Sequence, residues 1–189
     1  MILDIPYKSQ LPYETGREGE RKWCGIVSLW MVLSYYLKDK APSVENLLEK
    51  YGEEISESGF QHKDFLKIAR DFGLSGFRKS WWAEPGVFPV LEKFSAEGES
   101  DEEIKEWEET NFDEGIHTIR RYLNRKAPVI VSVNKDFSPS LSTHLVVITG
   151  YDPENLIIHD PLHKGPACKI KIEDFKNYWI RQAIIIKDQ

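Results

Sequence analysis

The sequence predicts a single α+β domain in which helices come first and an antiparallel sheet follows. Before residue 76, apolar residues recur at helical spacing. After residue 127, short β-branched runs are separated by Pro, Gly, Asn and Asp, which is typical of strands and turns. Because 189 residues is an ordinary length for one domain and no linker interrupts the chain, we expect one domain over 1–189. Residues 76–113 are a possible insertion or lid within it.

The predicted central helix lies in "RKWCGIVSLWMVLSYYL", where it runs from Cys24 to Leu37 and is apolar almost all round. Such a helix belongs in a protein core. A second helix follows Ser43, a plausible N-cap, and stops at Gly52. Two further helices are expected in "GFQHKDFLKIARDFG" and "IHTIRRYLNRKAP", with the apolar face of the latter formed by Ile116, Ile119, Tyr122 and Leu123.

The predicted strands are short and rich in Val and Ile, and they lie at 128–133, 144–151, 155–160, 168–172 and 183–186. One or two helical turns are expected in "IEDFKNYW", before the last strand. Residues 76–98 fit no single element, and their Trp81–Trp82 pair suits either the core or a contact patch. Segment 97–114 is strongly acidic, which fits a solvated helix or irregular insertion and equally a lid or a docking surface.

Composition excludes several classes of function. A formal charge of −6 makes nucleic acid a poor partner. No run reaches the roughly 18 apolar residues of a membrane span, and the first ten residues lack the pattern of a signal peptide. We therefore expect a cytoplasmic protein. Two cysteines form no disulfide framework, although a single Cys24–Cys168 bridge remains possible.

Cys24 has two interpretations. Free cysteines are often buried structural residues. However, Cys24 stands where the central helix should begin, beside unpaired backbone N–H groups that favour an anion. Arg21 and Lys22 also favour a thiolate, and Gly25 leaves room for a substrate backbone. These features make Cys24 a candidate nucleophile.

A nucleophile needs a base, and the hairpin around "YDPEN" supplies a candidate. If strand 144–151 pairs with strand 155–160 about Asp152–Pro153, His144 lies opposite Asp160, within one residue. A carboxylate beside an imidazole can fix its tautomer and stabilise its protonated form. Alone, this pair would fit a structural ion pair; together with Cys24 it indicates a catalytic group.

The other histidines carry no comparable signal. His62 and His117 are expected on the surfaces of helices, and His159 should point to the face opposite Asp160. His159 and His163 are four residues apart, but Pro161 argues against a helix and no third ligand is evident. We therefore expect neither a metal nor a cofactor.

Four motifs, in the order "IPYKSQ", "WCGIVSLWMVLSYY", "HLVVITGYD" and "LIIHDP", resemble the C39-type and C39-like cysteine peptidases, a branch of the papain-like fold. The resemblance covers most of the chain except roughly residues 76–113. It implies that Cys24 is the nucleophile, that His144 is the general base and then the acid, and that Asp160 orients His144. It also implies that the side-chain amide of Gln10, with the backbone N–H of Cys24, forms an oxyanion hole.

Three features depart from the family pattern. Ile26 and Val27 replace small residues after Cys-Gly, where they would narrow the cleft. "LPYETGREGERK" lengthens the interval from Gln10 to Cys24, and segment 97–114 has no family counterpart. Members that cut leader peptides after a double glycine are fused to an exporter, which this chain does not contain.

The expected function is hydrolysis of a peptide or amide bond in a peptide or protein substrate, through a thioester on Cys24. Transfer of the acyl group to an amine is an alternative outcome of the same site. A catalytically silent peptide-binding module is another. A docking protein that uses the acidic segment and the tryptophan pair is a third and weaker one.

Overall fold

The computed structural model describes residues 1–13, 23–52, 62–81, 112–137, 143–162 and 166–188. Its helices are α1 (Cys24–Leu37), α2 (Val44–Tyr51), α3 (His62–Asp71), α5 (Phe112–Asn124) and α6 (Ile172–Tyr178), with short 3-10 turns at Leu11–Tyr13, Lys38–Lys40 and Lys135–Phe137. Its strands are β1 (Ser75–Ser80), β2 (Val129–Asn134), β3 (Thr143–Tyr151), β4 (Asn155–His159), β5 (Cys168–Lys171) and β6 (Trp179–Lys187). The predicted α+β class is therefore confirmed.

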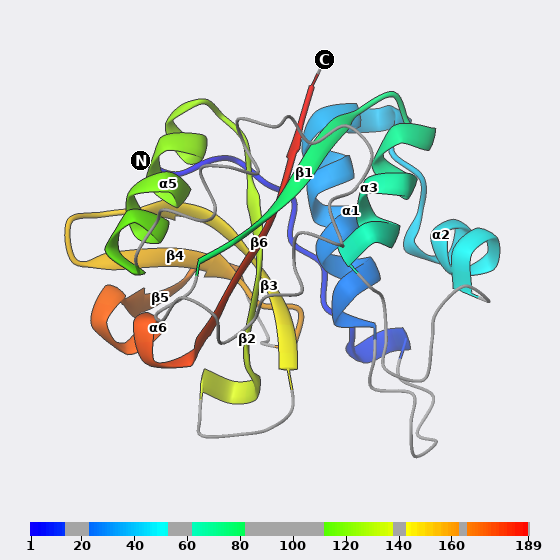
Figure 1. Ribbon diagram of the computed structural model, residues 1–189. Coiled ribbons are helices and arrows are strands. Elements are labelled where there is room, and N and C mark those ends of the chain that lie inside the picture. The colour runs from blue at the N-terminus through cyan, green and yellow to red at the C-terminus, as the bar shows by residue number, and fades with distance from the viewer. Residues whose placement is uncertain (14–22, 53–61, 82–111, 138–142, 163–165, 189) are drawn as a thin grey trace.

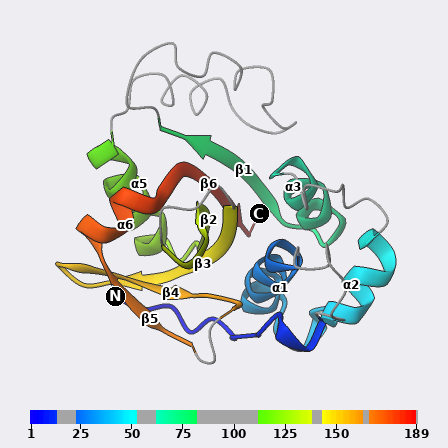
Figure 2. The same ribbon diagram turned by 90° about the horizontal axis from the view of Figure 1, so that it is seen from below.

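The six strands form one antiparallel sheet in the order β1-β6-β2-β3-β4-β5. Strands β2 to β5 form the predicted meander, and β6 returns to lie between β2 and β1. Helices α1, α2 and α3 lie on one side of this sheet, and α5 and α6 lie on the other (Figures 1 and 2). Strands β2, β3 and β6, in the interior of this order, therefore have helices on both sides.

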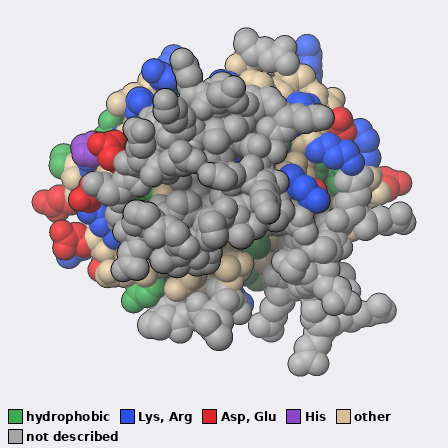
Figure 3. All heavy atoms as spheres, in the orientation of Figure 1, with side chains coloured by type: hydrophobic (Ala, Val, Ile, Leu, Met, Phe, Trp, Pro, Cys, Tyr) green, Lys and Arg blue, Asp and Glu red, His purple; other side chains and the backbone are tan. Residues whose placement is uncertain are grey.

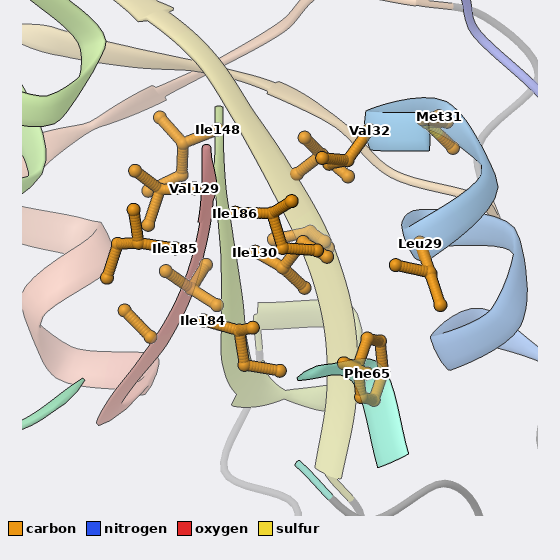
Figure 4. Packing of buried hydrophobic residues seen from close by; sticks show 14 of the residues in the cluster. Leu29, Met31, Val32, Phe65, Val129, Ile130, Ile148, Ile184, Ile185 and Ile186 are labelled. Carbon is orange, nitrogen blue, oxygen red and sulfur yellow. The ribbon is translucent and has the colours of Figure 1, made fainter. Parts of the chain in front are cut away.

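Coverage on both sides explains why β2, β3 and β6 each contain an uninterrupted apolar run, at residues 129–131, 146–148 and 183–186, instead of alternating. In Figure 4, Ile130, Ile184 and Ile186 point toward α1 and α3, whereas Ile148 and Ile185 point to the opposite side. All five side chains are at most 1% exposed. The core therefore consists of two apolar layers that share the sheet.

The predicted ends of α2 and the predicted stop of α3 are confirmed, whereas α5 begins at Phe112, four residues before the expected start. Ser43 caps α2 by accepting a hydrogen bond from the backbone N–H of Asn46 at 3.1 Å. Gly73 follows α3 with φ of +77°, a conformation that glycine adopts without steric cost. The apolar face expected on α5 is buried at all four of its positions.

Strand β1 was not predicted. Its sequence "SGFRKS" contains Gly, Arg and Lys, which are poor strand signals, yet it pairs with β6 along its whole length. Trp81 directly after β1 is fully buried, so its assignment to the core is correct and its use in an exposed contact patch is wrong. Trp82 and most of the acidic segment 97–114 lie outside the described residues.

An ion pair links α5 and α6 on their side of the sheet. Lys176 of α6 forms an ion pair with Asp113 of α5. On the face shown in Figure 3, acidic side chains gather at the edge beside α6, and Lys and Arg side chains are visible beside α3.

Among the described residues, no helix is long and apolar enough to cross a bilayer.

Leu29 in the middle of α1 tests the dependence of the fold on this helix. Leu29 is fully buried, so Leu29→Ala should lower the free energy of unfolding by about 2–5 kcal/mol, measured by urea denaturation. Leu11→Ala is the matched control, because Leu11 is 41% exposed and its loss should cost much less. Equal losses in the two variants would contradict the central position of α1.

Candidate active site

Cys24 is the first residue of α1, as predicted. The preceding residue, Trp23, makes no side-chain cap, so the first N–H groups of the helix remain available near the thiol. The side chain is partly exposed rather than buried, which removes the main argument for a purely structural cysteine. The thiol therefore lies at a helix N-terminus, where the helix dipole favours negative charge.

His144 and Asp160 form a buried pair. His144 Nε2 donates a hydrogen bond to Asp160 Oδ1 at 2.8 Å, and each side chain is 3% exposed. The backbone N–H of Leu162 donates to the same carboxylate oxygen at 2.8 Å. Because Nε2 of the imidazole is engaged by the carboxylate, Nδ1 is the ring nitrogen left for another partner.

The thiol of Cys24 is close enough to His144 to affect its protonation. Burial alone would lower the pKa of His144. Hydrogen bonds to Asp160 and to Cys24, together with the negative charges that these two groups can carry, outweigh burial and raise the pKa to about 9. The structure thus brings Cys24, His144 and Asp160 together, from α1, β3 and the end of β4.

The predicted register of the hairpin is wrong by two residues. Val147 lies opposite His159, so continuation of the ladder puts Val146, not His144, opposite Asp160. Two features set the observed pairing. Asp152 accepts hydrogen bonds from the N–H groups of Glu154 and Asn155, so that the turn is centred one residue later than expected, and a register shift between Ile148 and Gly150 then moves the pairing back by one residue. His144 therefore reaches Asp160 diagonally, on the same face of the sheet.

Gln10 is buried, with 1% of its surface exposed. Its backbone N–H donates to the carbonyl oxygen of Pro161 at 2.8 Å, and its own carbonyl accepts from Tyr13 N at 2.9 Å. The segment that carries Gln10 is thus fixed beside the residue that follows Asp160.

The remaining histidines differ from one another. His117 is exposed on α5, as expected, and His159 is 5% exposed and bonded to the N-terminal segment. The side chain of His62 and all of His163 lie outside the described residues. Within the described part of the chain, no three His, Cys, Asp or Glu side chains are grouped as a metal site would require.

Sequence reasoning missed one neighbour of the site. Cys168, the first residue of β5, is partly buried, and burial first and the charge of Asp160 second raise the pKa of its thiol. The pairing of Cys168 with Ile158 puts it on the Asp160 face of the sheet. Both cysteines are free thiols, so the Cys24–Cys168 bridge is absent from this structure.

Ile26 and Val27 do not narrow a cleft. Both are fully buried among the residues of the hydrophobic core. A helix that begins at Cys24 turns these two side chains inward and leaves the thiol at its end. The longer interval between Gln10 and Cys24 falls mainly on residues 14–22, which lie outside the described residues.

Three solved structures with a similar fold are described as a protease, a peptidase domain and a C39-like peptidase. A double glycine motif protease from an AMS/PCAT transporter, in complex with the leader peptide, is 20% identical, with a TM-score of 0.61 and coverage of 100% of this chain and 94% of that one. The peptidase domain of Streptococcus ComA, a bifunctional ABC transporter of a quorum-sensing pathway, is 20% identical, with a TM-score of 0.58 and coverage of 89% and 93%. A protein described as a C39-like peptidase of Bacillus anthracis is 17% identical, with a TM-score of 0.64 and coverage of 100% and 98%.

These similarities define the class as the C39 peptidase-domain fold, the papain-like α+β fold that the sequence predicted. The model of the Peptidase C39 like family matches residues 2–183. The chain therefore belongs to the Peptidase C39 like family. A search of curated proteins finds no match.

The raised pKa of His144 predicts how stability depends on pH. A group whose pKa rises from 6.5 to about 9 on folding contributes stability that is complete below pH 6.5 and is lost as the pH rises through about 9. We expect the difference in unfolding free energy between the unmodified protein and His144→Gln to shrink over this range. Urea denaturation between pH 6 and pH 10 measures it.

His117→Gln is the control for this prediction, because His117 is exposed. Its effect on the free energy of unfolding should be small at every pH. A His144→Gln difference that grows as the pH rises would contradict the assignment of the raised pKa to His144.

Proposed function

We propose that this protein is a cysteine peptidase that cleaves a peptide or amide bond through a thioester on Cys24. The observation that carries the proposal is the position of His144 between two groups. Its Nε2 is bonded to the buried carboxylate of Asp160, and the ring also interacts with Cys24 at the start of α1. A nucleophile, a base and a group that orients the base are the parts that thiol catalysis needs.

In the first step, His144 already holds the proton of the Cys24 thiol, and the sulfur of Cys24 attacks the carbonyl carbon of the substrate. The C–S bond forms and the carbonyl electrons move to oxygen. When this tetrahedral intermediate collapses, the C–N bond breaks and His144 gives its proton to the leaving amine. A pKa of about 9 keeps this proton on His144 at neutral pH, where the amine needs it.

Negative charge on the carbonyl oxygen needs donors that are already in place. The side-chain amide of Gln10 and the backbone N–H of Cys24 are the proposed donors. The burial of Gln10 and its backbone bond to Pro161 support this role, because a donor held by the fold needs no reorganisation during the reaction.

In the second step, water loses a proton to His144 and attacks the thioester. The C–S bond breaks, the acid product leaves, and Cys24 recovers its proton from His144. An amine can replace water in this step, and the result is then acyl transfer. Analysis of the products with and without an added amine distinguishes these outcomes.

We infer a peptide substrate. The protease from the AMS/PCAT transporter was solved with a leader peptide, and it shares the fold over the whole of this chain. Main-chain amides are also the acyl donors that a thiol and an oxyanion hole are suited to cleave. The proposal extends to a peptide in general and not to a double-glycine leader, which is the ligand named for that protease.

The reactivity of Cys24 tests the proposal without knowledge of the substrate. Alkylation by iodoacetamide should be faster at Cys24 than at Cys168 at pH 6–7, and His144→Ala should reduce the difference at least tenfold. Cys168 serves as the internal control, because burial and then the charge of Asp160 raise the pKa of its thiol. Mass spectrometry of the two modified peptides measures both rates in one sample.

The opposite result would favour the peptide-binding alternative. If Cys24 reacts no faster than Cys168, and its rate of alkylation is the same in His144→Ala as in the unmodified protein, the thiol is not activated. The search would then turn from cleaved substrates to bound partners.

Gln10→Ala separates the oxyanion donor from the thiol. Acylation by p-nitrophenyl acetate, followed as release of p-nitrophenolate, should slow by about 10²–10³-fold. Alkylation by iodoacetamide creates no oxyanion, so its rate should stay within about twofold of the unmodified protein. Parallel losses in both reactions would mean that Gln10 supports the structure of the site rather than the oxyanion.

A further inference from the structure

The imidazole of His159 joins two segments that are far apart in the sequence. Its Nε2 lies 2.9 Å from the carbonyl oxygen of Ile5, and its Nδ1 accepts a hydrogen bond from the backbone N–H of Ala167 at 3.1 Å. The residue is 5% exposed, and the ring of Tyr7 packs edge-on against it at 5.6 Å and 90°. Both ring nitrogens are therefore engaged, and both partners are backbone groups.

These partners fix the roles of the two ring nitrogens. A backbone N–H can only donate, so Nδ1 accepts from Ala167, and a carbonyl oxygen can only accept, so Nε2 donates to Ile5. His159 thus acts as a bridge with one donor and one acceptor, a pattern that no aliphatic side chain can reproduce.

The two bridged segments carry proposed site residues. Ile5 lies on the same N-terminal segment as Gln10, and Ala167 lies on the connection that follows Asp160. Figure 2 shows the N-terminal segment running beside β4 toward α1. Displacement of either segment would move a group of the site.

Further bonds between these segments converge on the same region. The hydroxyl of Tyr7 donates to the carbonyl of Asp160 at 3.1 Å, and Ser9 Oγ donates to the carbonyl of Pro161 at 3.3 Å. Residues 3–9 belong to no helix or strand, so contacts such as these, together with the backbone bond of Gln10, determine where Gln10 lies. The hydrogen bond between His159 and Ile5 is the most buried of these side-chain contacts.

The backbone of Ala167 indicates that its position is constrained. Its φ is +59°, in the left-handed region that favours glycine. A non-glycine residue stays in this conformation when the surrounding structure determines it. The hydrogen bond from Ala167 to His159 is one of the contacts that does so.

We propose that His159 is a positioning residue for the oxyanion donor: it holds the segment of Gln10 against the connection that follows Asp160. This inference rests on the proposed function, since it concerns the same site. His159 bonds to Ile5 and Ala167 and not to Cys24 or His144, so its effect on the reaction passes through the position of Gln10.

The test compares two reactions of Cys24. In His159→Leu, acylation by p-nitrophenyl acetate should fall by up to about 100-fold, because small misplacements of a catalytic group are costly. Alkylation by iodoacetamide depends on the thiol and His144, and it should stay within about twofold. His159→Gln offers both a donor and an acceptor and should recover most of the acylation rate. His117→Leu removes an exposed histidine and is the matched control.

A double-variant cycle identifies the residue through which His159 acts. If it acts through Gln10, His159→Leu should slow acylation little further when Gln10→Ala is already present. If the fold-losses in acylation rate of the two single variants multiply in the double variant, the proposal is overturned. So would a His159→Leu protein that acylates at the unmodified rate, or one that loses alkylation and acylation in parallel.

Folding and the proposed function are controlled separately. If His159→Leu does not fold, His159→Asn replaces it, because asparagine is too short to reach both partners yet is polar. Faster acylation in His159→Gln than in His159→Asn supports the bridge, and equal rates contradict it. Absence of Cys24-dependent nitrophenolate release from the unmodified protein would instead contradict the proposed function, and the positioning role with it.

Discussion

The packing of α1 against β3 is the constraint on which the rest of the structure depends. The helix is apolar almost all round and crosses the sheet at the strand that begins with Thr143 and His144. Ser28 Oγ adds a specific bond, donated to the carbonyl oxygen of Leu145 at 3.2 Å. Because the N-terminal end of the helix carries Cys24, this one contact places the thiol beside the imidazole.

The local parts of the fold could be predicted, because each depends on a short stretch of sequence. The helix from Cys24 to Leu37 and the Val- and Ile-rich strands follow from which faces must be buried. Strand β1 could not be predicted, because Arg78 and Lys79 are buried there through pairing with β6, a partner more than 100 residues away. Long-range pairing overrode the local preference.

The candidate site likewise has some features that could be predicted from the sequence and others that could not. His144 and Asp160 lie in one hairpin, so strand periodicity was enough to put them on one face, although the turn at Asp152 shifted the register. The burial of Gln10 and the bridge made by His159 rest on bonds between residues some 150 positions apart. Each of these bonds has a backbone group on at least one side, and because every residue has such groups, no pattern of side-chain types in the sequence indicates the bond.

Burial of the pair of His144 and Asp160 has a cost in free energy. Taking a carboxylate out of water is unfavourable, and the attraction of its partner offsets only part of this cost, so a buried ion pair is weak evidence for stability. A strongly shifted pKa beside a partly exposed thiol is instead typical of a functional site. Asp160 accepts from Leu162 N–H as well as from His144, so the backbone also fixes the position of the carboxylate. In the proposed mechanism, the buried charged pair holds a proton, whereas Gln10 donates a hydrogen bond and His159 positions the segment of Gln10.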